Sequence, residues 1–272
     1  MPSALAFVRI RLIRADDAEN LASGAMSCEE IASSVTFSES WAPLVQQGET
    51  WTSQFTEKPL LSDISQYLKD TIVKEDSEGR IYAILYEVFP EGKESEEAVA
   101  VSDRIWAMSL PIVLIDHSLE YCDGYARIIW KREFNKEKAV DWQRLSAVLK
   151  KVFIYFTGAR KRGLSDSDLL YFRRKLGVTS DKDTVTLERL SNEAAEKDSD
   201  FSFWAWFFSI CEKVKQDFLP YWEKGYLMGF EGKKSLAKRL LNEDKRFFLL
   251  RFSDSQLGAL AVSRFDFDRS TG

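Results

Sequence analysis

The sequence predicts a multidomain chain in which an all-β unit is followed by an all-α unit and then by the opening of an α+β domain. Apolar residues alternate at period two in several strand-length runs before about residue 135, and at spacings of three and four residues after it. Beyond residue 225 the predicted order becomes helix, strand, turn, strand. We therefore place the domains at residues 1–135, 136–215 and 216–272.

The β unit begins with Ala6–Arg14 (AFVRIRLIR), whose alternation of apolar and basic residues is typical of a half-buried strand. Residues 15–80 show only a weak pattern, which predicts no definite element. Three further runs are rich in β-branched and aromatic residues and are predicted as strands: Ile81–Phe89, Pro111–Ile115 and Tyr125–Trp130.

The α unit begins with a predicted helix whose apolar face starts at Trp142 and ends at Phe156, with Gly158 as its stop. A second helix is predicted to begin after Ser165, which caps it together with Asp168 at the third helical position, and to end at Gly177.

A third helix is predicted over Thr186–Ala195. The fourth begins near Ser202 and is apolar almost all round, so it should lie deep among its neighbours until Pro220 disturbs it. The last domain is predicted to contain a helix over Lys233–Leu241 and strands over Phe247–Ser253 and Ala259–Phe267.

Composition excludes several classes of protein. A hydrophobic content of 45% with 19 Phe, 9 Tyr and 8 Trp predicts packed cores, since these rings need burial or a binding role. The three cysteines, Cys28, Cys122 and Cys211, are odd in number and far apart, which favours a reducing compartment over a disulfide framework or a metal site. The longest apolar run, around Phe201–Ile210, is shorter than the roughly 20 residues that span a bilayer. We expect an intracellular protein without membrane insertion.

Charge differs in sign along the chain. Asp16–Glu97 carries 18 acidic and 5 basic residues, whereas Lys131–Lys175 carries 13 basic and 5 acidic ones. The net +8 of the second stretch could face phosphate groups, although a solvated helical face is the commoner explanation of such a pattern.

The segment Phe247–Ser255 (FFLLRFSDS) places Arg251 in the middle of an apolar strand. A buried guanidinium needs a partner anion, and its planar fork suits phosphate because it can donate two parallel hydrogen bonds. The hydroxyls of Ser253 and Ser255 could donate more. The alternative is an ordinary strand arginine that faces an edge.

Two segments carry a family resemblance. Phe248–Ser255 resembles the FLLRFSES strand of the SH2 domain of the STAT family, the signal transducers and activators of transcription, and Tyr221–Phe230 (YWEKGYLMGF) resembles the family's YWNDGYIMGF segment. The likeness extends upstream through Phe203–Tyr221, through Trp142–Gly177 with its KRGL at residues 161–164, and through Ser109–Trp130.

This resemblance implies an incomplete immunoglobulin-like DNA-binding barrel, an all-α linker domain and an SH2 domain that is truncated at Gly272. It also implies a phosphotyrosine pocket formed by Arg251, Lys233, Ser253 and Ser255. Asp254 stands where many family members have Glu.

For DNA binding, the resemblance implies a contact at Asp116 and His117, which replace a Ser-Asn pair whose Asn reaches a base edge in much of the family. His117 can donate to a base acceptor, whereas Asp116 would repel phosphate. A surface-loop histidine is an equally good explanation. Lys161 and Arg162 would add sequence-independent attraction to DNA.

No enzyme is predicted, because His117 is the only histidine and the sequence shows neither a Gly-rich phosphate loop nor metal-spaced ligands. No cofactor or metal is expected. The resemblance implies a signal-dependent transcription factor of cytoplasm and nucleus, which forms a homodimer or a STAT-like heterodimer after an upstream tyrosine kinase or receptor has acted. Its partners would be double-stranded DNA and phosphotyrosine-containing protein segments. The alternative is a phosphotyrosine-binding adaptor, or a truncated isoform, that does not bind DNA specifically.

Overall fold

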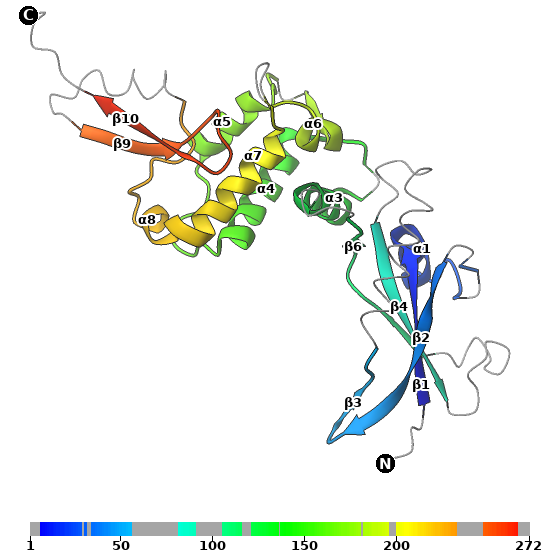
Figure 1. Cartoon of the computed structure of the whole chain (residues 1–272). Coiled ribbons are helices and arrows are strands. Elements are labelled where there is room, and N and C mark those ends of the chain that lie inside the picture. The colour runs from blue at the N-terminus through cyan, green and yellow to red at the C-terminus, as the bar shows by residue number, and fades with distance from the viewer. Residues whose placement is uncertain are drawn as a thin grey trace, which may run out of the picture. The chain divides into compact units, whose positions relative to one another are not determined.

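The computed structural model describes residues 6–28, 30–31, 34–55, 81–90, 105–115, 121–135, 137–180, 182–195, 200–232 and 247–265. The chain divides into two compact units, residues 1–128 and 129–272 (Figure 1). Asp116, His117, Lys233 and the helix predicted over Lys233–Leu241 lie outside the described residues.

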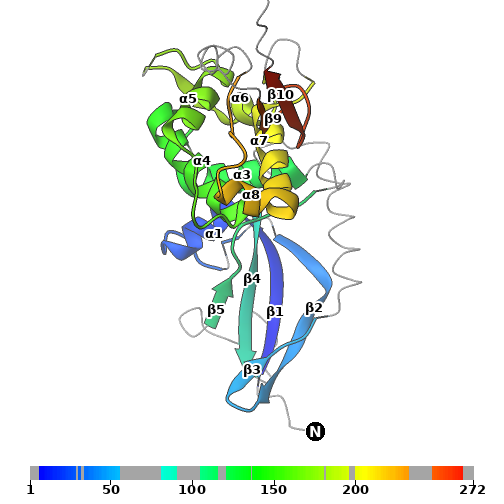
Figure 2. The same ribbon diagram turned by 90° about the vertical axis from the view of Figure 1, so that its left-hand side faces the viewer.

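The first unit contains a curled antiparallel sheet in the order β3-β2-β1-β4-β5, with β6 also paired to β4 (Figure 2). The strands are β1 (Ala6–Arg14), β2 (Ser34–Gln47), β3 (Thr50–Thr52), β4 (Ile81–Pro90), β5 (Ile105–Met108) and β6 (Ile112–Val113). The predicted strands Ala6–Arg14 and Ile81–Phe89 are confirmed, and β6 lies within the predicted Pro111–Ile115. The long strand β2 lies where the sequence predicted no definite element.

The central strand β1 is buried on both faces, whereas the sequence predicted burial of one face only. Helix α1 (Ala15–Ala22) lies against β1 and β4, and Leu21 joins Ile13 and Leu85 in one apolar cluster. Ile10 and Leu12 form a second cluster with Tyr82. Arg9 and Arg11 alternate with these residues and are also buried.

The strand predicted over Tyr125–Trp130 is wrong, because these residues lie within helix α3 (Tyr121–Phe134). The buried side chains Ala126, Ile129, Trp130 and Phe134 recur at helical rather than alternating spacing. The predicted run of six residues is too short to show this helical period, which becomes visible only when the run is extended to Phe134. The rings of Trp130 and Phe134 lie 4.9 Å apart between centroids.

In the second unit, helices α4 (Trp142–Thr157) and α5 (Asp166–Lys175) confirm the first two predicted helices. Gly158 ends α4 in the left-handed conformation that glycine adopts without steric cost. Ser165 caps α5: its hydroxyl accepts from the Asp168 amide, and the Asp168 side chain accepts from the Ser165 amide, as the sequence predicted.

The predicted third helix is shorter in the structure, where α6 spans Leu187–Ser191 after the small strand pair β7 (Ala139–Asp141) and β8 (Thr184–Thr186). The fourth helix is confirmed as α7 (Phe203–Lys213), capped by Ser202 and buried on nearly every side. A π-helical turn (Val214–Phe218) and α8 (Leu219–Glu223) follow, with Pro220 in the first turn of α8.

The core of this unit is aromatic. Phe230 lies in the segment after α8, and rings from α4, α5, α7 and α8 pack edge to face around it: Phe153, Phe172, Trp206 and Trp222. The hairpin of β9 (Phe247–Phe252) and β10 (Leu260–Phe265) joins this core through Phe252, whose ring lies 4.8 Å from that of Phe230. The predicted boundary at residue 215 therefore stays a prediction, since the described residues on both sides share one core.

Candidate anion-binding site

Arg251 is the last residue but one of β9, and it is paired across the hairpin with Ala261 of β10. On its other side β9 is hydrogen-bonded to the backbone of the segment after α8. The Met228 amide donates to the Leu250 carbonyl at 2.9 Å, and the Phe252 amide donates to the Gly229 carbonyl at 3.2 Å. Arg251 is only 8% exposed. An arginine so placed must find acceptors inside the protein or in a ligand.

One side of the Arg251 guanidinium is occupied. Its Nη1 donates to the Phe252 carbonyl at 3.1 Å and to Asp254 Oδ2 at 2.9 Å. Its Nε is buried without a hydrogen-bond partner in the described part of the chain, and the contacts of these residues include none to Nη2. Leaving a buried donor unpaired is costly, so the edge formed by Nε and Nη2 is where an anion would be stabilised.

The two predicted serines lie in the turn after this strand. Ser253 is buried, its Oγ accepts from the Ser255 amide at 3.3 Å, and its carbonyl accepts from Trp206 Nε1 at 2.8 Å. Ser255 is exposed. Arg251, Ser253 and Ser255 thus lie in β9 and the turn that follows it, while Lys233 lies outside the described residues.

Sequence reasoning missed a tyrosine at this site. Tyr171 of α5 donates a short hydrogen bond to Asp254 Oδ1, although the two residues are 83 positions apart. Its ring lies 6.0 Å from that of Trp206, which holds the neighbouring residue of the same turn. The capping pattern predicted α5 but carried no sign of which face meets the turn.

Arg162 lies in a structural clamp. Its guanidinium donates to the carbonyls of Trp222, Leu227 and Met228, and it covers the Trp222 ring at 3.8 Å. The Trp222 indole donates back to the Arg162 carbonyl at 2.8 Å. Partial burial lowers the pKa of Arg162 from its usual value. The KRGL loop and the YWEKGYLMGF segment therefore contact each other directly.

Lys161, in contrast, is exposed. Its amide and that of Arg160 donate to Glu223 Oε1 at 3.1 Å and 2.7 Å, and these bonds lower the pKa of Glu223. Of the two basic residues expected near DNA, Lys161 thus has its side chain at the surface, whereas the Arg162 guanidinium holds backbone carbonyls.

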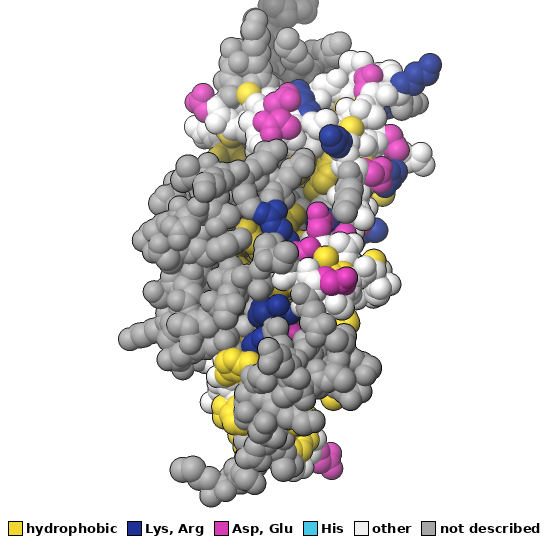
Figure 3. Space-filling model, turned by 90° about the vertical axis from the view of Figure 1, so that its right-hand side faces the viewer, with side chains coloured by type: hydrophobic (Ala, Val, Ile, Leu, Met, Phe, Trp, Pro, Cys, Tyr) yellow, Lys and Arg dark blue, Asp and Glu magenta, His cyan; other side chains and the backbone are white. Residues whose placement is uncertain are grey.

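Charges of the basic stretch are partly balanced by acids. Lys150 pairs with Asp166 at 3.2 Å, Arg144 pairs with Glu137 at 2.6 Å, and Lys151 lies 3.6 Å from Glu133. On the face drawn in Figure 3, the described Lys and Arg side chains are interspersed with Asp and Glu. The net charge of the stretch therefore overstates its attraction for a polyanion.

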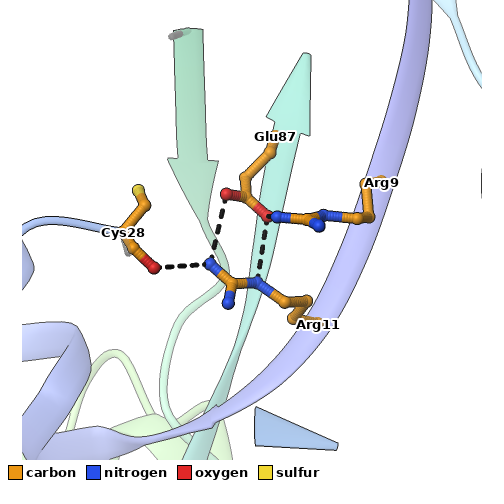
Figure 4. Close-up of polar contacts among 4 residues, drawn as sticks. All are labelled: Arg9, Arg11, Cys28 and Glu87. Carbon is orange, nitrogen blue, oxygen red and sulfur yellow. Dashed lines mark hydrogen bonds and ion pairs between the residues drawn. The ribbon is translucent and has the colours of Figure 1, made fainter. Parts of the chain in front are cut away.

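The first unit also contains buried strand arginines, Arg9 and Arg11, which form a cluster with Glu87 (Figure 4). Glu87 of β4 accepts from Arg9 Nε and Nη2 at 3.0 Å and 2.7 Å, and from Arg11 Nε and Nη2 at 3.0 Å and 3.2 Å. Arg11 Nη2 also donates to the Cys28 carbonyl at 2.9 Å. This cluster is an internal ion pair, because its anion is a protein carboxylate.

Over the described ranges, no three His, Cys, Asp or Glu side chains are grouped as metal ligands. None of the helices in the same ranges has both the length and the apolar character that a membrane span requires.

Comparison with known proteins supports the same interpretation of the helical unit. Residues 129–207 match the family described as signal transducer and activator of transcription, linker domain. Over 194 residues the chain is 37% identical to signal transducer and activator of transcription 1 of Caenorhabditis elegans, a match that covers 66% of this chain and 27% of the relative.

Two further relatives come from other animals. The chain is 32% identical over 170 residues to the signal transducer and transcription activator of Drosophila melanogaster, covering 59% of the chain and 22% of the relative. It is 26% identical over 174 residues to human signal transducer and activator of transcription 6, covering 59% of the chain and 20% of the relative. The chain thus spans about a quarter, or less, of the length of these relatives.

These matches place the helical unit among the linker domains of signal transducers and activators of transcription. The chain belongs to the STAT family.

Proposed function

We infer that the chain serves a STAT-like, signal-dependent transcription factor that dimerises through contacts between an SH2 domain and phosphotyrosine and that binds DNA. The observation that carries this inference is the buried guanidinium of Arg251, whose Nε has no partner among the described residues. Relatives named signal transducers and activators of transcription support the regulatory role.

Phosphotyrosine suits the Arg251 site on grounds of charge and geometry. A phosphate group carries about −1.5 to −2 charges near neutral pH and three acceptor oxygens. Two of these oxygens can meet Nε and Nη2 side by side, and the Ser253 and Ser255 hydroxyls follow within one turn. We assign Arg251, Ser253 and Ser255 to the phosphate contact, with Lys233 as a second basic group, and residues 216–272 to an SH2 domain.

For the rest of the molecule, we assign the curled sheet to an immunoglobulin-like DNA-binding barrel and the helices from residue 136 to 215 to the linker domain. His117 and Asp116 would lie at the base contact, and Lys161 would add general attraction to phosphates. In this proposal a tyrosine kinase acts in the cytoplasm, and the parallel homodimer or heterodimer acts on double-stranded DNA in the nucleus.

The test is a calorimetric titration of the chain with a phosphotyrosine peptide pool of randomised flanking sequence and with the same pool unphosphorylated. We expect binding of the phosphorylated pool only. Arg251→Leu should weaken it by about 30-fold or more, because truncating one partner of a buried charged contact costs about 2–5 kcal/mol. Arg251→Lys should recover little, since an ammonium group cannot replace the planar fork.

Arg174→Leu is the matched control, because it removes the same charge from an exposed position on α5 and should leave the affinity unchanged. Equal affinity of the wild type for both pools would refute the phosphotyrosine assignment. If phosphotyrosine binding is retained but the phosphorylated dimer shows no DNA sequence preference, the protein is a phosphotyrosine adaptor. If the dimer has a sequence preference that His117→Ala leaves unchanged, His117 does not contact a base.

A further inference from the structure

The turn that follows β9 is held by side chains from two helices of the linker region. Tyr171 of α5 donates to Asp254 Oδ1, and Trp206 of α7 donates to the Ser253 carbonyl at 2.8 Å. Both helix residues lie within the segment that matches the linker domain. The surroundings of Arg251 are therefore built from two parts of the sequence that lie about 50 to 80 residues apart.

Asp254 connects one of these helices to Arg251. Its Oδ1 accepts from the Tyr171 hydroxyl, and its Oδ2 accepts from Arg251 Nη1 at 2.9 Å. A carboxylate with a different donor on each oxygen has its plane fixed, because rotation would break one bond or the other. The Phe252 carbonyl accepts from the same Nη1 at 3.1 Å, so the two acceptors of this nitrogen fix the orientation of the guanidinium.

The orientation that results leaves the Nε and Nη2 edge for a ligand. Since Nη1 has two hydrogens and the described residues offer it two acceptors, its donor capacity is used. A phosphate that binds side by side to Nε and Nη2 need not displace Asp254. Repulsion between Asp254 and phosphate is reduced because the Asp254 side chain is 29% exposed and hydrogen-bonded to Tyr171.

We propose that Tyr171, on the linker helix α5, is a positioning residue for phosphotyrosine binding, acting through Asp254 on the guanidinium of Arg251. This inference rests on the proposed phosphotyrosine function of the same site. Fixing a binding group in its productive orientation before the ligand arrives removes part of the entropy cost of binding. The linker domain would then contribute directly to the affinity of the neighbouring phosphate site.

The experiment compares Tyr171→Phe, Asp254→Asn and the double variant in the full chain. Affinity is measured by fluorescence anisotropy with the labelled phosphotyrosine peptide pool. Tyr171→Phe should weaken binding about fivefold, the lower end of measured couplings between sites. Asp254→Asn should weaken binding at least as much. The double variant should bind the peptides as tightly as Asp254→Asn does, because both substitutions break the same connection from Tyr171 through Asp254 to Arg251.

Tyr155→Phe is the control, since this tyrosine of α4 is 78% exposed and should be replaceable without effect. A second measurement needs no peptide: the amide-region NMR signal of the Arg251 Nε–H group, assigned by its loss in Arg251→Lys. Tyr171→Phe should shift or broaden this signal, whereas a role confined to packing in α5 would leave it unmoved.

The outcomes separate the two proposals. If the wild type prefers the phosphorylated pool, while Tyr171→Phe binds as tightly as the wild type and leaves the Nε–H signal unchanged, the positioning role is overturned and the phosphotyrosine function stands. If the wild type does not distinguish the pools, the phosphotyrosine function fails together with the effect on affinity. An Nε–H signal unchanged by Tyr171→Phe would then also refute control of the guanidinium.

Discussion

Buried arginines occur within a strand in both units, and their partners differ. Arg9 of β1 lies directly opposite Glu87 of β4, and the carboxylate, which is fully buried, accepts from both Arg9 and Arg11. Arg251 lies opposite Ala261, and its acidic partner is Asp254 in the following turn. In β1 the neighbouring strand β4 thus supplies a carboxylate that binds both arginines, whereas the β10 residue opposite Arg251 has no polar side chain.

The energetic consequence follows from burial of the partner. Water cannot reach the fully buried Glu87 carboxylate or its two guanidinium partners. Removing the carboxylate charge therefore leaves uncompensated positive charge in a low-dielectric region. Asp254 is partly exposed, and water can replace Arg251 there. The first cluster should therefore determine stability, whereas Arg251 should determine binding.

The largest expected effect is that of Glu87→Gln, which should lower the free energy of unfolding of the first unit by about 3–5 kcal/mol. The amide keeps the shape but cannot balance Arg9 and Arg11. Hydrogen exchange of the β1 and β4 amides measures the change locally. Glu49→Gln, at an exposed position of the same unit, should change it by less than about 0.5 kcal/mol. Similar values for the two variants would show that the ion pair does not stabilise the sheet.

Much of the helical unit could be predicted from sequence because its signals are local. Ser165 with Asp168 predicted the start of α5, Gly158 the end of α4, and Ser202 the start of α7. The strand predicted at Tyr125–Trp130 failed because six residues contain too few turns of a helix to distinguish the two periods.

The candidate site was predictable only in part, for a related reason. Arg251 was recognisable because a charge interrupts an apolar strand, and Ser253 follows it two positions later. The contributions of Tyr171 and Trp206 depend on tertiary packing, which has no local signature. The burial of Arg9 and Arg11 depends in the same way on the distant Glu87. The sequence showed the basic side chains of β1 but not their partner.

A smaller loss of stability is expected for a substitution at Gly229, whose carbonyl accepts a hydrogen bond from the Phe252 amide of β9. Its φ is +100°, and a Cβ there would lie 2.9 Å from Asp168 Oδ1 and 3.3 Å from the Trp222 ring. Gly229→Ala should lower the free energy of unfolding of the second unit by about 2–3 kcal/mol, since backbone strain of this kind costs about 1–3 kcal/mol and the contact adds to it.

Gly225→Ala provides the matched control for this change. Gly225 also has a positive φ, of +77°, but nothing lies within 4 Å of its added Cβ. Its substitution should cost about 1–2 kcal/mol, the penalty of the left-handed conformation alone. Thermal unfolding of both variants separates the steric part from the backbone part. Equal losses would mean that the Asp168 and Trp222 contacts relax without cost, and that β9 is not held rigidly from this side.

The smallest expected effect on stability is that of Arg251→Leu, and it completes the contrast with Glu87. The substitution removes the two hydrogen bonds of Nη1, but it also removes the buried Nε that lacks a partner. Asp254 keeps its bond from Tyr171 and its access to water. We therefore expect the free energy of unfolding of the second unit to change by less than about 1 kcal/mol, because an apolar side chain can replace a buried charge with little net cost. Chemical denaturation of the variant and the wild type measures this directly. A loss of 3 kcal/mol or more, comparable with that of Glu87→Gln, would show that Arg251 stabilises the fold as the arginines of β1 do, and a defect in phosphotyrosine binding could then no longer be attributed to its guanidinium alone.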